Sequence, residues 1–333
     1  MNFQRKNSHL RKLIYCIVVF QVFSLTQKVA AQQLPLLSQY LFNGFLVNPA
    51  FAGLDGLSTI TLTAREQWMG LANRPMTHIV SFQTRILPKN FVNKNASSRL
   101  RIMKRYTSGR VAVGGYVFND RNGIIDRTGA QLTYAYHIPM KKNSLSLAMS
   151  FSMYQFSINH HKIELETTSD QLIDNTSLNM IIPDVGVGAV FKTQEYFAGL
   201  SISNLMQSYA KLGYNSDVQF KTYRQYNLTL GYRYGLGQDR TFEPGVLVKT
   251  TNQLITQVDI TAKLHVNDYW GGITYRTGSA FILLGGITIN KLSFGYAFDY
   301  NLNAISQYSF GSHEIMAAYK FGNTASRMRW LNK

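Results

Sequence analysis

The sequence predicts an all-β protein, a transmembrane antiparallel β-barrel of the outer membrane with about 14 strands. Three observations predict it. Segments of alternating polar and apolar residues recur along most of the chain, several are ten or more residues long, and their polar faces are mostly Ser, Thr, Gly, Gln and Ala. Such lengths approach the roughly 9 to 11 residues of a membrane-spanning strand, whereas globular strands average about 5 to 6. The alternative is a soluble secreted β-sandwich, but a sandwich would expose charged residues on its polar face.

The first 31 residues have the three parts of a secretory signal peptide. Four basic residues precede an apolar core at 13–25, and Val29-Ala30-Ala31 stands before Gln32. We expect cleavage after Ala31 and export to the bacterial outer membrane. An uncleaved anchor helix is the alternative, but the apolar core is shorter than the roughly 20 residues that a membrane helix needs.

Composition and charge exclude several classes of protein. After residue 25, no apolar run approaches the roughly 18 to 20 residues of a membrane helix, which excludes a helical membrane protein. Cys16 is the one cysteine and lies in the predicted signal, so no disulfide is expected. The full sequence has 34 basic and 17 acidic residues. Without the five basic residues of the predicted signal, the net charge is +12. In an exported chain this charge favours anionic lipid, polysaccharide or acidic protein partners, and not nucleic acid.

The N-terminal segment 32–56 leads into the first strand through the motif Asn48-Pro49-Ala50-Phe51-Ala52-Gly53. The Asn-Pro pair disfavours a helical conformation at Asn48, Pro49 has a fixed φ, and Gly53 permits unusual backbone angles. We expect this segment to be periplasmic or folded into the lumen. Barrels of this size lie between filled eight-strand barrels and open porins, so partial plugging of the lumen is an open interpretation.

The barrel is expected over residues 57–321. One strong alternation has Leu147, Met149 and Phe151 on one face and serines on the other. The expected strands are 57–68, 78–86, 110–119, 128–138, 143–157, 184–192, 195–203, 222–235, 241–249, 253–266, 268–276, 279–287, 291–300 and 308–321.

Loop lengths predict an orientation. If the N-terminus starts in the periplasm, the connections on the periplasmic side are short apart from 87–109. The long connections at 158–183 and 204–221 then lie on the side of the cell exterior. Outer-membrane barrels have this asymmetry of short periplasmic turns and longer outer loops. The tail 322–333 would then be periplasmic.

The longest connection on the periplasmic side is strongly basic. It contains Lys89, Arg101, Lys104 and Arg105 and no acidic residue. A solvated turn is the plain interpretation. The more specific hypothesis is that these four residues dock onto an acidic component of a larger machine or onto the inner leaflet.

Two further groups of residues are candidate structural or partner-binding sites. Gln67 and Trp68 close the first strand near the outer rim, where Trp68 would anchor at the membrane interface. The closing strand begins with Gly311, Ser312, His313 and Glu314. Adjacent His and Glu residues suggest proton transfer. However, neighbours in a strand point to opposite faces, so His313 and Glu314 are not expected to meet one substrate.

Several motifs occur in a fixed order along the strands, and together they resemble the PorP/SprF family of type IX secretion system membrane proteins. They are Gln39-Tyr40-Leu41-Phe42-Asn43, the motif at 48–53, Arg65-Glu66-Gln67-Trp68, Phe118-Asn119-Asp120, Gly295-Tyr296-Ala297-Phe298-Asp299-Tyr300 and Gly311-Ser312-His313-Glu314-Ile315-Met316. The chain departs from the family at Phe51, where tyrosine is common, and at Ala297, where serine is common. The resemblance implies an outer-membrane barrel that supports the export or surface attachment of secreted proteins such as gliding adhesins. Some members are associated with the ring-forming periplasmic part of the secretion machine.

The expected function is therefore non-enzymatic, without cofactor or metal, and acts by protein–protein docking at the rims of the barrel. Expected partners are a secreted surface adhesin or its C-terminal signal domain, other type IX secretion components, and the lipid bilayer. Two alternatives stay open. One is a passive channel or hydrophobic-solute transporter, and the other is an outer-membrane hydrolase with a Ser and a His on adjacent strands.

Overall fold

The computed structural model describes residues 37–40, 42–86, 110–141, 143–158, 179–211, 219–237 and 239–321. The predicted signal peptide 1–31, the tail 322–333 and the basic segment with Lys89, Arg101, Lys104 and Arg105 lie outside these ranges, so the expectations for them stay predictions. Within the described ranges, no helix is long and apolar enough to cross a membrane.

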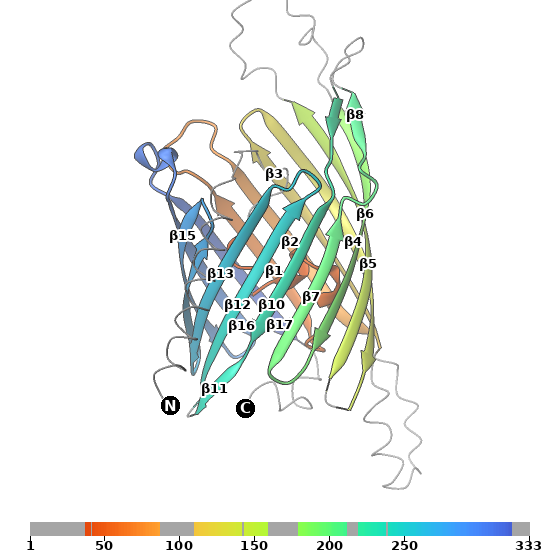
Figure 1. Cartoon of the computed structure of the whole chain (residues 1–333), viewed down its shortest axis with the longest axis vertical. Helices are drawn as coiled ribbons and strands as arrows, with labels where there is room; N and C mark the ends of the chain where they lie inside the picture. The colour runs from red at the N-terminus through yellow and green to blue at the C-terminus, as the bar shows by residue number, and fades with distance from the viewer. Residues whose placement is uncertain are drawn as a thin grey trace, which may run out of the picture. The chain divides into compact units, whose positions relative to one another are not determined.

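The described chain is a closed antiparallel barrel of 14 strands, as predicted (Figure 1). Each strand pairs with its neighbours in the chain. The wall closes where β10 pairs with both β7 and β12 and where β1 pairs with β17. β11 continues the line of β10 after a break at Arg233, so the two count as one strand. The strands are β1 (Ser58–Glu66), β2 (Met76–Ile86), β3 (Val111–Asn122), β4 (Ile125–Pro139), β5 (Ser144–Ile158), β6 (Asn179–Lys192), β7 (Tyr196–Ser203), β10 (Gln225–Tyr232), β11 (Tyr234–Gly237), β12 (Arg240–Thr251), β13 (Thr256–Val266), β14 (Tyr269–Arg276), β15 (Ala280–Ile289), β16 (Leu292–Asn301) and β17 (Ser312–Phe321).

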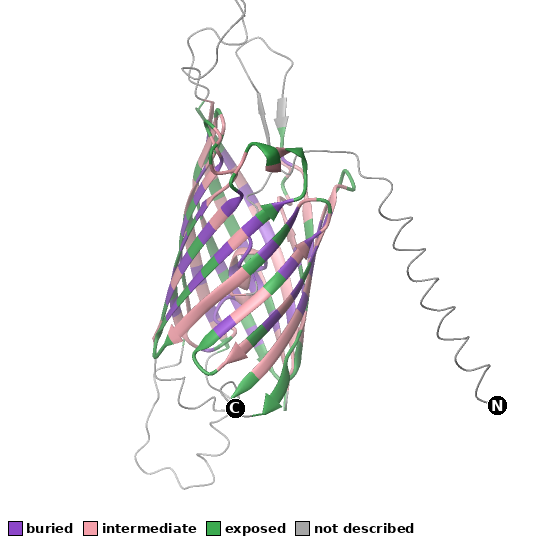
Figure 2. Ribbon diagram, turned by 90° about the vertical axis from the view of Figure 1, so that its left-hand side faces the viewer, coloured by how far each residue is buried: buried purple, intermediate pink, exposed green. Residues whose placement is uncertain are grey.

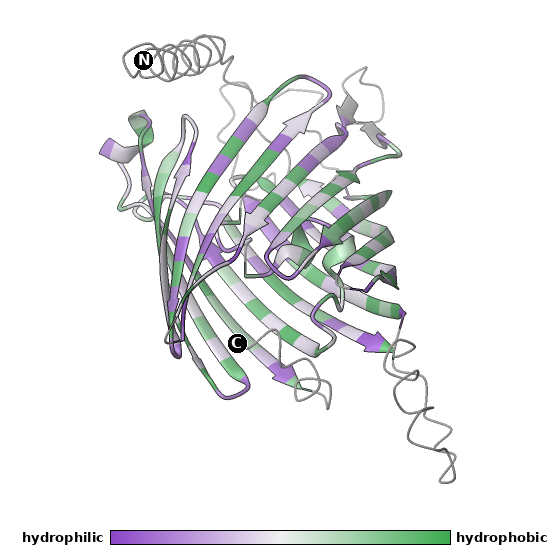
Figure 3. Cartoon of the chain, turned by 60° about the horizontal axis from the view of Figure 1, so that its bottom comes forward, coloured by the Kyte–Doolittle hydropathy of each residue, from purple (hydrophilic) through white to green (hydrophobic). Residues whose placement is uncertain are grey.

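The wall has the polarity of a membrane barrel, apolar outside and polar inside. Along β1, buried Thr61 and Thr63 alternate with Ile60 and Leu62, which are 39% and 50% exposed. The same alternation of buried and exposed positions bands the strands in Figure 2, and hydropathy alternates along them in Figure 3. A soluble protein would bury the apolar face, whereas here that face is outside, where lipid would solvate it.

Several strands differ from the prediction at their ends. β6 begins at Asn179 and not at 184, because Pro183 does not end it. β7 pairs with β6 only from Val187 onward, so Pro183 lies where no N–H is needed for that ladder. β17 begins at Ser312 and not at 308, since a 3-10 turn, η5 (Ala304–Gln307), and the positive φ of Gly311 precede it.

One small sheet was not predicted. A hairpin of β8 (Tyr209–Lys211) and β9 (Gln219–Lys221) extends the connection between β7 and β10. This connection, together with those at 67–75 and 302–311, is at one end of the barrel, which we call the loop end. The opposite end, called the turn end, has the short connections β4–β5, β6–β7, β11–β12, β13–β14 and β15–β16.

Candidate functional site

The lumen contains a plug made of residues 37–40 and 42–56. Two short 3-10 turns shape it, η1 (Gly44–Leu46) and η2 (Pro49–Phe51). Asn48 has φ −140° and ψ 118°, outside the helical region as expected for a residue before proline, and its side chain accepts a hydrogen bond from the Ala50 N–H at 2.9 Å. The segment that was expected to be periplasmic or lumenal thus lies in the lumen over its described residues.

Asn48 ties one side of the plug to the wall. Its amide donates to the carbonyl oxygens of Ala189 in β6 and Leu200 in β7, at 3.2 and 3.0 Å, and the residue is fully buried. Gly188 makes this approach possible, because a Cβ there would overlap the Asn48 side chain and lie 3.1 Å from Pro49 Cδ. The Asn-Pro pair therefore both turns the plug and fixes it to two strands.

The other side of the plug is held by carboxylates. The backbone N–H groups of Ser38 and Gln39 donate to the two carboxylate oxygens of Glu314 in β17, at 2.7 and 3.0 Å. The Ser38 hydroxyl donates to Asp299 in β16 at 2.8 Å. Further hydrogen bonds join Tyr40 to Thr261, Asn43 to Ser81, Gly53 to Gln83, and the Ala52 carbonyl to His137. Strands on all sides of the lumen thus contact the plug.

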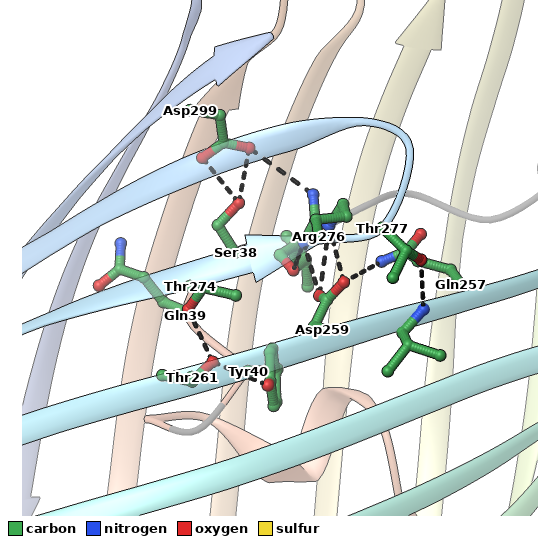
Figure 4. A network of polar contacts seen from close by, with 12 residues as sticks. Ser38, Gln39, Tyr40, Gln257, Asp259, Thr261, Thr274, Arg276, Thr277 and Asp299 are labelled. Carbon is green, nitrogen blue, oxygen red and sulfur yellow. Dashed lines mark hydrogen bonds and ion pairs between the residues drawn. The ribbon is translucent and has the colours of Figure 1, made fainter. Parts of the chain in front are cut away.

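Five charged residues, Arg65, Asp259, Arg276, Asp299 and Glu314, form a group near Ser38 that we call the charge cluster. Figure 4 shows three of them, Asp259, Arg276 and Asp299, with Ser38. Arg65 in β1 contacts Asp299 at 2.6 Å and Glu314 at 3.1 Å. Arg276 in β14 contacts Asp259 in β13 at 2.9 Å, and its guanidinium also donates to the Leu37 carbonyl at 3.2 Å. None of the five is more than 2% exposed. Burying charge is costly unless it is paired, and here each charge has a partner.

The charge cluster is nearly balanced. It has two arginines against three carboxylates, and a further basic residue, Lys249 of β12, is buried in the same lumen. The plug backbone is part of this arrangement, since Glu314 accepts from two of its N–H groups and Arg276 donates to one of its carbonyls. The charge cluster therefore serves as a latch that holds the start of the plug.

The residues singled out in the closing strand lie on two faces. His313 faces outward, with Nδ1 2.6 Å from the hydroxyl of Tyr296, whereas Glu314 faces the lumen and is 1% exposed. The pair therefore does not converge on one substrate. Gly311 accepts a backbone hydrogen bond from Met69 at 2.9 Å, and the Ser312 hydroxyl accepts one from the Trp68 N–H at 3.2 Å.

Gln67 and Trp68 therefore lie at the loop end, in the connection between β1 and β2. The Gln67 N–H donates to the Pro75 carbonyl at 2.8 Å, and Trp68 has a positive φ of 55°. These residues join the first connection to the last one. The geometry brings them next to Gly311 and Ser312.

The convergence of Arg65, Asp299 and Glu314 was not predicted from the sequence. The sequence did contain an indication of it, because each of the three is a charged residue at a lumen-facing position of an alternating strand. Each also belongs to one of the motifs that carry the family resemblance. The register that brings them together on the neighbouring strands β1, β17 and β16 could not be read from those motifs.

A cavity of about 160 Å³ lies at the turn end between the plug and the strands β6, β7, β10 and β12. Ion pairs stand at its rim, Asp55 with Lys192 at 3.0 Å and Arg233 with Glu243 at 2.5 Å. Lys192 lowers the pKa of the Asp55 carboxyl below its usual range. In the part of the chain that the structure describes, no group of three or more His, Cys, Asp or Glu side chains could hold a metal ion.

No curated protein matches the chain. Among solved structures, KdgM porin has a TM-score of 0.36 at 8% identity, covering 79% of this chain and 99% of its own. The TodX deltaS2S3 mutant monoaromatic hydrocarbon channel has a TM-score of 0.43 at 8% identity, with coverages of 83% and 93%. The translocator domain of autotransporter NalP from Neisseria meningitidis has a TM-score of 0.41 at 11% identity, with coverages of 85% and 96%. Likenesses this weak carry no argument about function.

A family model described as type IX secretion system membrane protein PorP/SprF matches residues 29–319. The match runs from before the plug to the closing strand. It includes Asn48 and every residue of the charge cluster. The chain therefore belongs to the PorP/SprF family of type IX secretion system membrane proteins.

Proposed function

We propose that this protein is a non-enzymatic outer-membrane component of the type IX secretion system that supports export or cell-surface attachment of a cognate secreted adhesin and thereby contributes to gliding motility. It acts by protein–protein docking at the rims of the barrel. One observation carries the proposal: the plug lies in the lumen and hydrogen-bonds to strands on several sides of it. A client that is not conducted through the lumen has to be bound at its ends.

The two ends suit different partners. The loop end would face the cell exterior and meet the adhesin or its C-terminal signal domain. The turn end would face the periplasm and meet other secretion components. β2 ends at Ile86 and β3 begins at Val111, so the basic connection with Lys89, Arg101, Lys104 and Arg105 starts and finishes at the turn end. Four positive charges there favour docking onto an acidic partner.

The test is co-purification of the tagged full-length protein from detergent-solubilised outer membrane, combined with mass spectrometry of the proteins released by a deletion strain. We expect a large secreted adhesin or periplasmic secretion components to co-purify, and the adhesin to disappear from the surface of the deletion strain. A barrel that purifies alone from a strain with unchanged secretion would refute the proposal. Reversing Lys89, Arg101, Lys104 and Arg105 to Glu tests the turn-end contact separately, at matched protein levels.

The second candidate function is a passive channel or hydrophobic-solute transporter. The cavity at the turn end favours it, since aromatic side chains line part of it. Ion conductance of the purified protein in planar bilayers, without any partner, would support this alternative.

A further inference from the structure

The connection between β16 and β17, residues 302–311, presents large apolar side chains that nothing in the barrel covers. Phe310 is 81% exposed, Tyr308 71% and Leu302 44%. Neighbouring apolar side chains left uncovered mark a surface that contacts lipid, a ligand or another protein. The sequence between Asp299 and Glu314 contains no Asp, Glu, Lys or Arg. The surface is therefore apolar and uncharged.

The apolar residues of this connection recur with the repeat of its backbone. η5 is a 3-10 turn, and a 3-10 backbone brings residues three apart onto the same side. Leu302, Ile305 and Tyr308 are spaced by three, and Asn, Ser and Gln residues stand between them. Segments that are apolar on one side and polar on the other are typical of a membrane interface.

The connection is continuous with the lipid-facing wall. Tyr300 in β16 and Phe281 in β15 are cross-strand partners on the outer face, and both are more than half exposed. The connection begins two residues after Tyr300. In Figures 1 and 3, η5 lies beyond the outer side of the wall at the loop end, and not over the lumen. Its apolar side chains therefore extend the surface that lipid would solvate.

Two backbone hydrogen bonds hold the connection against the barrel. The Phe310 N–H donates to the Met69 carbonyl at 2.8 Å, and the Met69 N–H donates to the Gly311 carbonyl at 2.9 Å. Gly70 leaves room for the Phe310 ring, because a Cβ at Gly70 would lie 3.0 Å from it. The last connection is thus joined to the one between β1 and β2, beside the seam where β17 pairs with β1.

We propose that the connection 302–311 is a membrane anchor, with Leu302, Tyr308 and Phe310 inserted into the interfacial region of the leaflet at the loop end. Aromatic rings favour this region, where a tyrosine buries its ring and keeps its hydroxyl hydrated. A segment without charged residues has no ion to desolvate as it enters. The anchor holds the closing seam at the level of the lipid headgroups. This inference does not depend on which protein is secreted.

The experiment places one bimane dye at a time on the purified full-length protein in phosphatidylcholine vesicles. Cys16 is the one cysteine of the sequence, so Cys16→Ser combined with Tyr308→Cys gives a single labelling site. Vesicles whose acyl chains are brominated quench a dye that lies among the lipids. Leu283→Cys, in the lipid-facing wall, is the control for lipid contact. Asn122→Cys, exposed near the tip of the hairpin between β3 and β4, is the control for water.

We expect the dye at position 308 to lose most of its fluorescence in brominated vesicles, as at position 283, and the dye at 122 to keep it. No quenching at 308 would overturn the inference and would leave the exposed side chains as a surface for a protein partner. Quenching at 122 equal to that at 308 would also overturn it, because the connection would then not differ from the rest of the loop end.

A second substitution tests whether the apolar side chains hold the connection in the membrane. Adding Phe310→Asp should reduce the quenching at position 308, because a carboxylate is costly to insert. Leu254→Asp is the matched control, since Leu254 is also strongly exposed but lies in the connection between β12 and β13. Heat-dependent mobility on gels verifies that each variant is a folded barrel. Unchanged quenching with Phe310→Asp would refute the anchor.

Discussion

The guanidinium of Arg65 lies 2.6 Å from a carboxylate oxygen of Asp299, although the two residues are 234 positions apart in the chain. Both side chains are 2% exposed, so water does not screen the pair. Buried ion pairs add little stability over an apolar replacement of both partners, but removing one partner is costly. The pair is therefore a sensitive place to test whether the latch holds the plug.

Replacing Arg65 with methionine should destabilise the barrel by about 3 to 5 kcal/mol, because Asp299 and Glu314 lose a buried positive partner. Urea denaturation of the detergent-solubilised barrel measures the free energy of unfolding. Arg74→Met is the control. Its pair with Glu66, at 2.9 Å, is more than a third exposed on both sides and should contribute less than about 1 kcal/mol. Equal losses of unfolding free energy in the two variants would contradict the inference that the charge cluster holds the plug.

Gly188→Ala should displace the plug without changing any charge. The new methyl group would overlap Asn48 and break its hydrogen bonds to Ala189 and Leu200, at a cost of about 1 to 3 kcal/mol for buried groups left unpaired. We expect protease to cut the plug faster in this variant. Gly285→Ala is the matched control in β15, since no atom lies within 4 Å of its added Cβ. A plug equally resistant in both variants would argue against Asn48 as an anchor.

Deleting residues 37–54 should open a water-filled path through the barrel. The full-length protein should conduct little in planar bilayers, because the plug occupies the lumen. The shortened protein should give steady ion conductance, provided that its strands still assemble, which heat-dependent mobility on gels would verify. High conductance of the full-length protein would favour the passive-channel alternative.

The Asp55 ion pair predicts a small dependence of stability on pH. Lys192 lowers the pKa of Asp55 in the folded state, so the carboxylate adds stability above its unfolded pKa of about 3.9 and loses it as the pH falls below that value. Asp55 is 57% exposed, so the effect should stay under about 1 kcal/mol and shrink with added salt. The unfolding free energy of Asp55→Asn should therefore differ from the unmodified protein at neutral pH and converge with it in acid. A difference that grows in acid would contradict this assignment.

The strands were predictable because alternation is a local property of the sequence. Each of the fourteen expected strands matches one in the barrel, and Leu147, Met149 and Phe151 are exposed on one face, as the alternation predicted. Strand ends were less predictable, as at Pro183, because whether a proline ends a strand depends on the neighbouring strand.

The site was less predictable because it depends on distant pairings. Glu314 and Arg65 are direct partners across the β1–β17 seam, and Asp259 and Arg276 are partners between β13 and β14. Finding these pairs requires the register of each strand, which alternation fixes only up to shifts of two residues. The plug was harder still, because residues 37–56 have no periodic pattern to reveal which strands they contact.

The hydrogen bond from the Ser38 N–H to Glu314 joins parts of the chain that are 276 residues apart. It connects the plug, which precedes the first strand, to β17, which closes the wall. The plug can reach its final position only when β17 is in place, and β17 in turn closes the wall against β1. Closure of the wall and anchoring of the start of the plug therefore depend on the same strand, so a chain without β17 would lack both.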